Sequence, residues 1–318
     1  MQADKLSAVI PENLAGKRLD QALAALFPQH SRSRLQGWIR DGKVLLNGEQ
    51  PQQRRTVTKG DMVEVIPVPE THAAWYPEPI ALDILHEDDS LLIINKPAGL
   101  VVHPGAGNPA HTLLNALLHY DPALAGVPRA GIIQRLDKDT SGIMVIARTP
   151  EAHTFLVDQM QLRLIQREYE AIVTGTITSG GSINDPIGRH PVHRKRMAVT
   201  SKGKTAITHY RIIRKYRSHT HLRIRLETGR THQIRVHMAS IHHPLVGDPV
   251  YGGRLRLPAS IPEELRGQLQ SFPRQALHAC ILELTHPVSG TKLRQDTPLP
   301  ADMIALLKAL DHAASSDR

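Results

Sequence analysis

Apolar residues recur at helical spacing twice near the start of the chain. The first run, residues 17–27, ends at Pro28 and predicts a short amphipathic helix. The second run, residues 31–40, can begin with the capping hydroxyl of Ser31, and its arginines lie largely off the apolar stripe. The core stripe of this second helix consists of Leu35, Trp38 and Ile39.

The chain divides into two parts on either side of a proline-rich segment. After the two helices, VLLNGEQ and the alternating MVEVIPV predict a small set of strands. Residues 69–79, PETHAAWYPEP, have no periodicity and few hydrophobic residues, which indicates a linker. We therefore expect a small first domain over residues 1–68, with its core at about 16–66, and a larger domain over residues 80–318.

The larger domain mixes strands, hairpin signals and helices. LDILHEDDSLLIINKP predicts two strands around an acidic turn, and REYEAIVTG and HLRIRLETG alternate as half-buried strands do. Helices are predicted at HTLLNALLHY, after the capping Thr149, at THQIRVHMASI and from Ala301 onward. Regular alternation of single strands and helices is missing, which favours the α+β class with a mixed, largely antiparallel sheet.

A polar loop interrupts the apolar pattern in the middle of this domain. Ile132 and Ile133 predict the end of one buried strand, and residues 143–147 predict the next. The loop between them, residues 135–142, carries Asp137. Loops held by rigid strands commonly carry catalytic groups, although an ordinary connection with a solvated aspartate fits the same pattern.

Charge and composition narrow the function classes. The formal net charge of +9 points to a polyanionic partner, and charge alone does not separate nucleic acid from an anionic membrane. No stretch approaches the ~20 apolar residues that span a bilayer, so we expect a soluble, cytoplasmic protein. Two Trp, six Tyr and three Phe offer few platforms for base stacking, so RNA binding should depend on charge and shape. The lone Cys280 excludes an internal disulfide.

Two groups of cations are candidate RNA contacts, although solvated surfaces often carry such runs. Histidines 232, 237, 242 and 243 lack the spacing of a zinc-protease helix, and no metal site is predicted. The candidate RNA-binding residues are Arg18, Arg32, Arg34 and Lys43 in the first domain and Arg194, Lys195 and Arg196 in the second.

The larger domain contains four motifs: NKPAGLVVHPG (95–105), RLDKDTSG (135–142), REYEA (167–171) and GRTHQIRVHM (229–238). In their order and spacing they resemble the pseudouridine synthases that modify ribosomal RNA. The first 70 residues resemble the S4 domain, an RNA-docking module, and HPLVGDPVYGG extends the resemblance over nearly the whole chain.

The resemblance implies roles for four residues. Asp137 matches the catalytic aspartate, Arg135 an arginine that helps to hold the target base outside its helix, Tyr169 the tyrosine that packs on the uracil, and Arg235 the arginine paired with the aspartate. An arginine at ion-pair distance favours the anionic, nucleophilic form of a partly desolvated carboxylate.

The resemblance also implies the reaction. It is the isomerisation of uridine to pseudouridine without a cofactor, in 23S rRNA at the stem-loop of the subunit interface, on naked rRNA or a large-subunit precursor particle. A monomer is expected, because no exposed heptad or symmetric apolar face stands out.

Several alternatives stay open from the sequence. The aspartate can attack C1′ of the sugar, add to C6 of the base, or assist proton removal at C2′. Gln134 stands where related sequences often have His, and glutamine cannot titrate near neutral pH. One rival interpretation is a metal-dependent phosphotransferase, in which DKDT at 137–140 leads from a strand into a helix and Asp248 serves as an acid. Another is a non-catalytic RNA-binding assembly factor.

Overall fold

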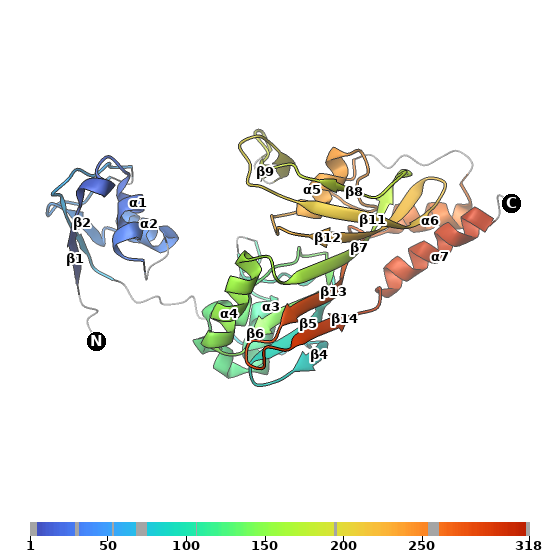
Figure 1. Ribbon diagram of the computed structural model, residues 1–318, viewed down its shortest axis with the longest axis horizontal. Helices are drawn as coiled ribbons and strands as arrows, with labels where there is room; N and C mark the ends of the chain where they lie inside the picture. The colour runs from blue at the N-terminus through green and yellow to red at the C-terminus, as the bar shows by residue number, and fades with distance from the viewer. Residues whose placement is uncertain are drawn as a thin grey trace. The chain divides into compact units, whose positions relative to one another are not determined.

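A computed structural model of the chain describes residues 5–28, 32–52, 54–67, 75–105, 107–193, 196–253 and 261–315 (Figure 1). The chain forms two compact units, Met1–Ala74 and Trp75–Arg318, which are described separately. The division falls within the predicted linker. Trp75, at the end of that linker, packs against the core of the second unit.

The first unit is a small antiparallel sheet with two helices. Its sheet has the strand order β1–β3–β2, and the helices α1 and α2 match the two predicted from the apolar spacing. Leu19, Leu35 and Val63 are fully buried in their shared core. The elements are β1 (Leu6–Val9), α1 (Leu19–Leu26), α2 (Arg32–Arg40), β2 (Val44–Leu46) and β3 (Met62–Val65), with a short 3-10 turn at Glu12–Leu14.

The second unit is built on one mixed sheet. Its strands run in the order β4–β5–β6–β13–β7–β12–β11–β8, and β14 pairs with β13. Only the β6–β13 pair is parallel among the strand pairs of this sheet, as the α+β prediction expects. The strands are β4 (Ile84–Glu87), β5 (Leu91–Lys96), β6 (Ser141–Ala147), β7 (Gln166–Thr174), β8 (Gly181–Ile183), β11 (Thr208–Lys215), β12 (His219–Leu226), β13 (Leu277–Thr285) and β14 (Lys292–Asp296).

Helices cover both faces of this sheet (Figure 1). The alternation along β5 shows the two faces, because Leu92 packs with α3 and α5 whereas Leu91 packs with α4. In the middle of the sheet, Ile172 of β7 belongs to a buried cluster with residues of α6 and α7. The helices are α3 (Leu113–Tyr120), α4 (Pro150–Gln161), α5 (Gln233–Ser240), α6 (Glu263–Ser271) and α7 (Ala301–Ser315); a separate hairpin pairs β9 (Ile187–Arg189) with β10 (Met197–Val199), and 3-10 turns span Pro122–Gly126 and Pro128–Gly131.

The segment before the Asp137 loop differs from its prediction. The apolar pair Ile132 and Ile133 is not the end of a strand, although Ile132 is 1% exposed. Arg129 and Ala130 adopt left-handed conformations, with φ of 57° and 51°, and these bend the chain out of an extended ladder. Ile132 then pairs with Ile146 only in an isolated bridge. The apolar pair therefore marks a buried loop.

The segment after the Asp137 loop bears on the phosphotransferase interpretation. That interpretation requires the DKDT stretch to lead into a helix, but the chain continues directly into β6. Gly142, with φ of 118°, lies against β13, where a Cβ atom would fall 2.1 Å from the backbone oxygen of Ala279. The end of the loop is therefore fixed where β6 begins, between β5 and β13. The helix that the phosphotransferase interpretation requires is not formed there.

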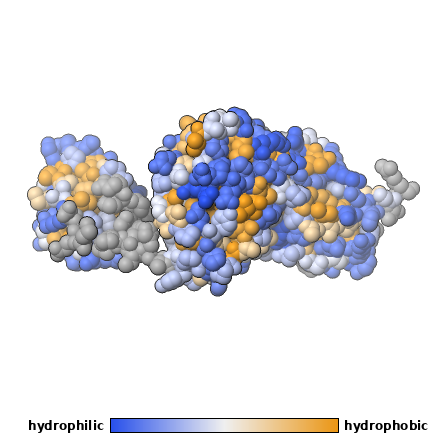
Figure 2. Space-filling view, turned by 90° about the horizontal axis from the view of Figure 1, so that it is seen from below, coloured by the Kyte–Doolittle hydropathy of each residue, from blue (hydrophilic) through white to orange (hydrophobic). Residues whose placement is uncertain are grey.

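On the surface seen in Figure 2, apolar residues form separate patches among hydrophilic ones. This mixture is ordinary for a protein whose main apolar side chains are buried inside each unit. Within the described part of the chain, none of the helices combines the length and the apolar character that crossing a membrane requires.

Candidate active site

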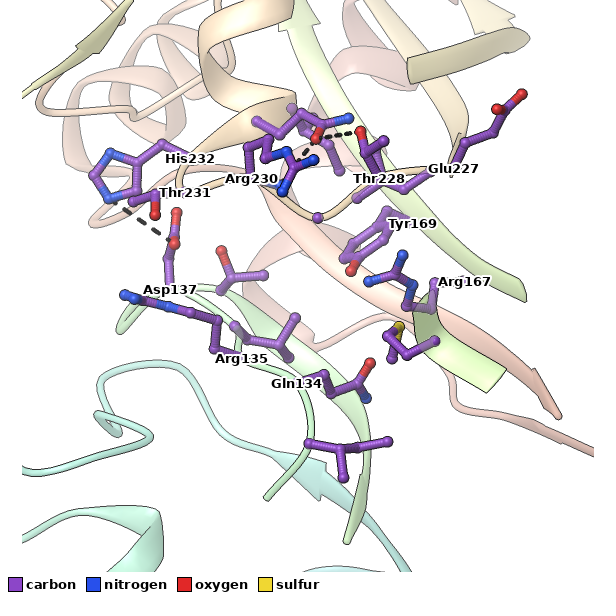
Figure 3. A pocket seen from close by; sticks show the side chains of 18 of the residues that line it. Gln134, Arg135, Asp137, Arg167, Tyr169, Glu227, Thr228, Arg230, Thr231 and His232 are labelled. Carbon is purple, nitrogen blue, oxygen red and sulfur yellow. Dashed lines mark hydrogen bonds and ion pairs between the residues drawn. The ribbon is translucent and has the colours of Figure 1, made fainter. Parts of the chain in front are cut away.

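A cavity of about 570 Å³ lies in the second unit (Figure 3). Most of its lining comes from the loop before β6, strand β7, and the turn between β12 and α5, and the end of α4, His103 and Leu277 complete it. This volume is typical of pockets that enclose a small organic group, which are commonly ~300–1,000 Å³. The predicted site residues Arg135, Asp137, Tyr169 and Arg235 all line it.

Asp137 is held next to a buried lysine. The Nζ of Lys96, which is fully buried, donates hydrogen bonds to the carbonyls of Pro97, Leu100 and Lys138 at 2.7, 2.9 and 3.0 Å. Burial lowers the pKa of Lys96 to about 7, while the nearby carboxylates act to raise it. Three acceptors match the three N–H bonds of an ammonium group, so Lys96 anchors the backbone beside Asp137.

A second anchor joins the same loop to the last helix. Arg274 donates from Nε and Nη2 to the carboxylate of Asp302 in α7, at 2.6 and 2.9 Å. Its Nη1 donates to the carbonyl oxygen of Asp139 at 3.2 Å. The Arg274 side chain is only 5% exposed, so these bonds form away from water, where they are stronger.

Arg235 connects two carboxylates. From α5 its Nη1 donates to Oδ2 of Asp137 at 2.9 Å, while Nε and Nη2 donate to Asp248 at 2.7 and 2.9 Å. Burial acts to lower the pKa of Arg235, but the hydrogen bonds and charges of Asp248 and Asp137 raise it above its usual range. Burial would raise the pKa of Asp248, yet Arg235 holds it below the usual value. The guanidinium therefore stays charged and fixed in orientation.

Tyr169 and Arg135 occupy different parts of the cavity. Tyr169, from β7, is 6% exposed, and burial raises the pKa of its hydroxyl, so it stays a neutral phenol. In Figure 3 its ring lies in the pocket beside Arg167. Arg135 is exposed, and its side chain extends near Asp137. Gln134 lines the same wall as Arg135.

The structure adds residues that the sequence analysis did not assign to this site. Asp248 was considered only as an acid of a phosphotransferase, and the structure uses it to hold Arg235. His232 was considered only as a metal ligand, and its Nε2 lies 3.9 Å from Oδ1 of Asp137. Tyr251 was not considered, and its hydroxyl is 2.9 Å from Nδ1 of His232. The sequence signal that could have identified Asp248 and Tyr251 is the stretch VGDPVYGG, because its Gly and Pro residues predict a turn that carries both side chains.

The predicted RNA-binding residues lie in two places. Arg18 and Arg32 are about half exposed, and both pair with the buried Asp20, at 3.0 and 2.6 Å. Lys43 and Arg196 are exposed. The side chain of Arg34 and residues Arg194 and Lys195 lie outside the described residues, so these three predictions stay as they were.

The histidines considered as metal ligands have other partners. His237 pairs with the hydroxyl of Thr208 at 2.8 Å and the carbonyl of Asp185 at 2.9 Å. His243 lies 2.9 Å from the carbonyl oxygen of Thr174. Among the side chains that the structure describes, no group of three His, Cys, Asp or Glu residues could hold a metal ion.

Family models match both units of the chain. The model described as RNA pseudouridylate synthase matches residues 90–240, which include the cavity loop, and the S4 domain model matches residues 17–63. Among solved structures, human RNA pseudouridylate synthase domain containing 4 is 27% identical with a TM-score of 0.57, covering 72% of this chain and 93% of that one.

Relatives of similar length are more alike. The ribosomal large subunit pseudouridine synthase D of Pseudomonas aeruginosa is 55% identical over 304 residues, 96% of this chain and 95% of that protein. The protein of the same name from Escherichia coli K12 is 54% identical over 312 residues, 97% of this chain and 95% of that protein. The chain therefore belongs to the RNA pseudouridine synthase family of isomerases, with an S4 domain ahead of its catalytic domain.

Proposed function

We propose that this protein converts uridines of 23S rRNA to pseudouridine, in the stem-loop at the subunit interface. The support is the similarity over nearly the full chain to enzymes named for the large ribosomal subunit. The formal net charge of +9 and the S4 domain suit a large anionic substrate. Because rRNA and its precursor particles are the proposed partners, the proposed location is the cytoplasm.

Asp137 is the proposed catalytic group. The observation that carries this proposal is the 2.9 Å contact between its Oδ2 and Nη1 of Arg235, at the wall of the cavity. In the reaction the C1′–N1 bond breaks, a C1′–C5 bond forms, the hydrogen leaves C5 and N1 gains a proton. Substrate and product are isomers, so no redox partner or group donor is required, and the proposed reaction uses no cofactor.

Tyr169 and Arg135 are the proposed substrate-binding residues. A uridine inside an rRNA stem must leave its stack to enter this cavity. The buried ring of Tyr169 offers a flat surface on which the extruded uracil packs while its glycosidic bond is broken. The exposed Arg135 at the same cavity holds the displaced nucleotide by its charge. An enclosed pocket keeps the detached base in place until it is rejoined.

Tritium release from rRNA labelled at uridine C5 tests this function, because forming the C1′–C5 bond must expel that hydrogen. The wild-type protein and Asp137→Asn are compared on naked 23S rRNA, on large-subunit precursor particles and on 16S rRNA, each with and without a chelator. We expect release by the wild type on the large-subunit substrates, unaffected by the chelator, and none by the variant. A filter-binding assay should show that Asp137→Asn still binds rRNA.

Three results would contradict the proposal or part of it. If Asp137→Asn released as much tritium as the wild type, Asp137 would not be the catalytic group. Absence of release by the wild type on every rRNA, with binding retained, would favour the non-catalytic assembly factor. Release only on 16S rRNA would keep the enzyme and change its substrate.

A further inference from the structure

The hydroxyl of Tyr251 connects the β9–β10 hairpin to the candidate catalytic aspartate. Its oxygen accepts a hydrogen bond from the backbone N–H of Met197, the first residue of β10, at 2.9 Å. The same oxygen lies 2.9 Å from Nδ1 of His232. On the other side of that imidazole, Nε2 lies 3.9 Å from Oδ1 of Asp137. The Tyr251 side chain therefore links the hairpin to His232, which lines the cavity.

The hydrogen bonds of Tyr251 favour one tautomer of His232. The backbone N–H of Met197 donates to the Tyr251 oxygen, and the phenol keeps one proton of its own to donate. Nδ1 of His232 lies 2.9 Å from that oxygen and is the acceptor when the Tyr251 proton is directed at it. Burial lowers the pKa of His232, which favours the neutral ring. A neutral ring that accepts at Nδ1 carries its proton on Nε2, the nitrogen that faces Asp137.

Both members of this contact are held firmly. His232 has a left-handed backbone, with φ of 56°, immediately before α5. The backbone N–H of Tyr251 donates to Oδ1 of Asp248 at 3.0 Å, and Asp248 also holds Arg235. The guanidinium carbon of Arg235 lies 5.1 Å from the centre of the Tyr251 ring. One carboxylate thus holds both the arginine side chain and the backbone of the tyrosine.

The hairpin carries an exposed cation that suits a phosphate contact. Arg196, directly before Met197, is exposed and basic, and its backbone N–H donates to the carbonyl of His193 at 2.8 Å. A phosphate that binds Arg196 therefore acts on the residue next to the Tyr251 hydrogen bond.

We propose that Tyr251 is a positioning residue: it fixes His232 as the Nε2–H tautomer beside Asp137 and couples that geometry to the β9–β10 hairpin. The expected effect on kcat rests on the proposed function, whereas the tautomer of His232 does not. The Nε2–H group then serves as a fixed donor toward Asp137 or toward a substrate oxygen seated next to it. Tyr251 itself acts through His232 and touches no reacting atom.

The test compares Tyr251→Phe, His232→Gln and the double variant by tritium release, with separate kcat and KM for rRNA. Tyr251→Phe keeps the ring over Arg235 and removes only the hydroxyl. We expect kcat to fall ~10-fold with KM within twofold of the wild type, as for a lost hydrogen bond that acts in the reaction. In the His232→Gln background, Tyr251→Phe should lower kcat less than twofold, because the imidazole that the hydroxyl positions is absent. Tyr120→Phe is the matched control, because it removes a hydroxyl that donates to Glu87 at 2.7 Å outside the cavity.

The tautomer is measured without activity, by ¹⁵N–¹H correlation of the histidine rings, with His232→Gln used for assignment. We expect the His232 proton on Nε2 in the wild type and a mixture of tautomers in Tyr251→Phe. A proton on Nδ1 in the wild type, or fully additive kinetic losses in the double variant, would overturn the inference. If the wild type releases no tritium, the proposed function fails, and the ring spectra still decide whether Tyr251 sets the tautomer.

Discussion

Arg235 and Asp248 are joined by two parallel hydrogen bonds, from Nε to Oδ2 at 2.7 Å and from Nη2 to Oδ1 at 2.9 Å. This bidentate geometry fixes the plane of the guanidinium. The remaining nitrogen, Nη1, is thereby aimed at Asp137, 98 positions away in sequence. The orientation of the candidate catalytic carboxylate, Asp137, therefore depends on a second carboxylate, Asp248, which is not among the residues that line the cavity.

The first prediction concerns this dependence. In Asp248→Asn, one of the two oxygens that hold Arg235 is replaced by an amide, so the guanidinium loses its fixed plane. We expect kcat/KM for rRNA to fall ~10–100-fold, mostly in kcat, as for loss of a residue that orients a catalytic group. Asp311→Asn is the matched control, since it disrupts an exposed pair with Arg214. An unchanged kcat in Asp248→Asn would show that Asp137 is oriented without it.

The second prediction concerns the ring of Tyr169, the proposed packing surface for the uracil. Tyr169→Phe keeps an aromatic ring at the cavity, whereas Tyr169→Leu keeps apolar volume and removes the flat surface. We expect the Leu variant to lose at least ~10-fold in kcat/KM, as when a base loses an aromatic partner, and the Phe variant to lose less. Both are measured by tritium release. Equal losses would show that the hydroxyl, not the ring, matters.

The third prediction concerns the hairpin. If Arg196 contacts one phosphate, Arg196→Ala should reduce the slope of log K against log salt by roughly one contact, ~0.7–0.9. Binding to 23S rRNA is measured between low and physiological salt. Lys308→Ala, an exposed cation on α7, is the control and should leave the slope unchanged. An unchanged slope in Arg196→Ala would remove this residue from the RNA interface.

The fourth prediction concerns Asp20, which is fully buried in the first unit. Burial alone would raise the pKa of Asp20, but hydrogen bonds from Gln36, Arg32 and Arg18 bring it below 3.8. A carboxylate whose pKa is lower in the folded state stabilises that state above its unfolded pKa, and this stabilisation is lost as the pH falls through the folded value. Asp20→Asn should therefore cost ~1–3 kcal/mol at pH 6 and progressively less below about pH 4.

Urea unfolding followed by Trp fluorescence measures this effect. The chain has two Trp residues, and Trp38 is buried in the first unit. In a Trp75→Phe background the signal reports on the first unit alone. A difference between wild type and Asp20→Asn that stays constant from pH 6 to pH 3 would contradict the role of the charged carboxylate.

Local patterns predicted local structure well. The period-two alternation in REYEAIVTG placed Tyr169 and Ala171 on one face of a strand, and both contact the same core. Ile132 and Ile133 were misassigned because burial alone does not distinguish a strand from a buried loop. The bend before them begins at two residues other than glycine, Arg129 and Ala130, whose left-handed conformations a sequence pattern does not indicate.

The periodicity of hydrophobic positions could not predict contacts between segments that are distant in sequence. The pairing of Arg235 with Asp137 was implied by the resemblance, and in the structure Nη1 of Arg235 lies 2.9 Å from Oδ2 of Asp137. The partnership of Arg235 with Asp248 and that of His232 with Tyr251 depend on how a turn folds back onto α5, which no local spacing encodes. Their roles in catalysis stay predictions.

The bond between Arg274 and Asp302 has a consequence for the newly made chain. Asp302 lies in the last helix, and its partner Arg274 also holds the backbone of the loop that carries Asp137. A nascent chain still on the ribosome that makes it contains Asp137 long before it contains Asp302. The loop that carries Asp137 therefore gains this support only after α7 has been synthesised and has packed onto the second unit.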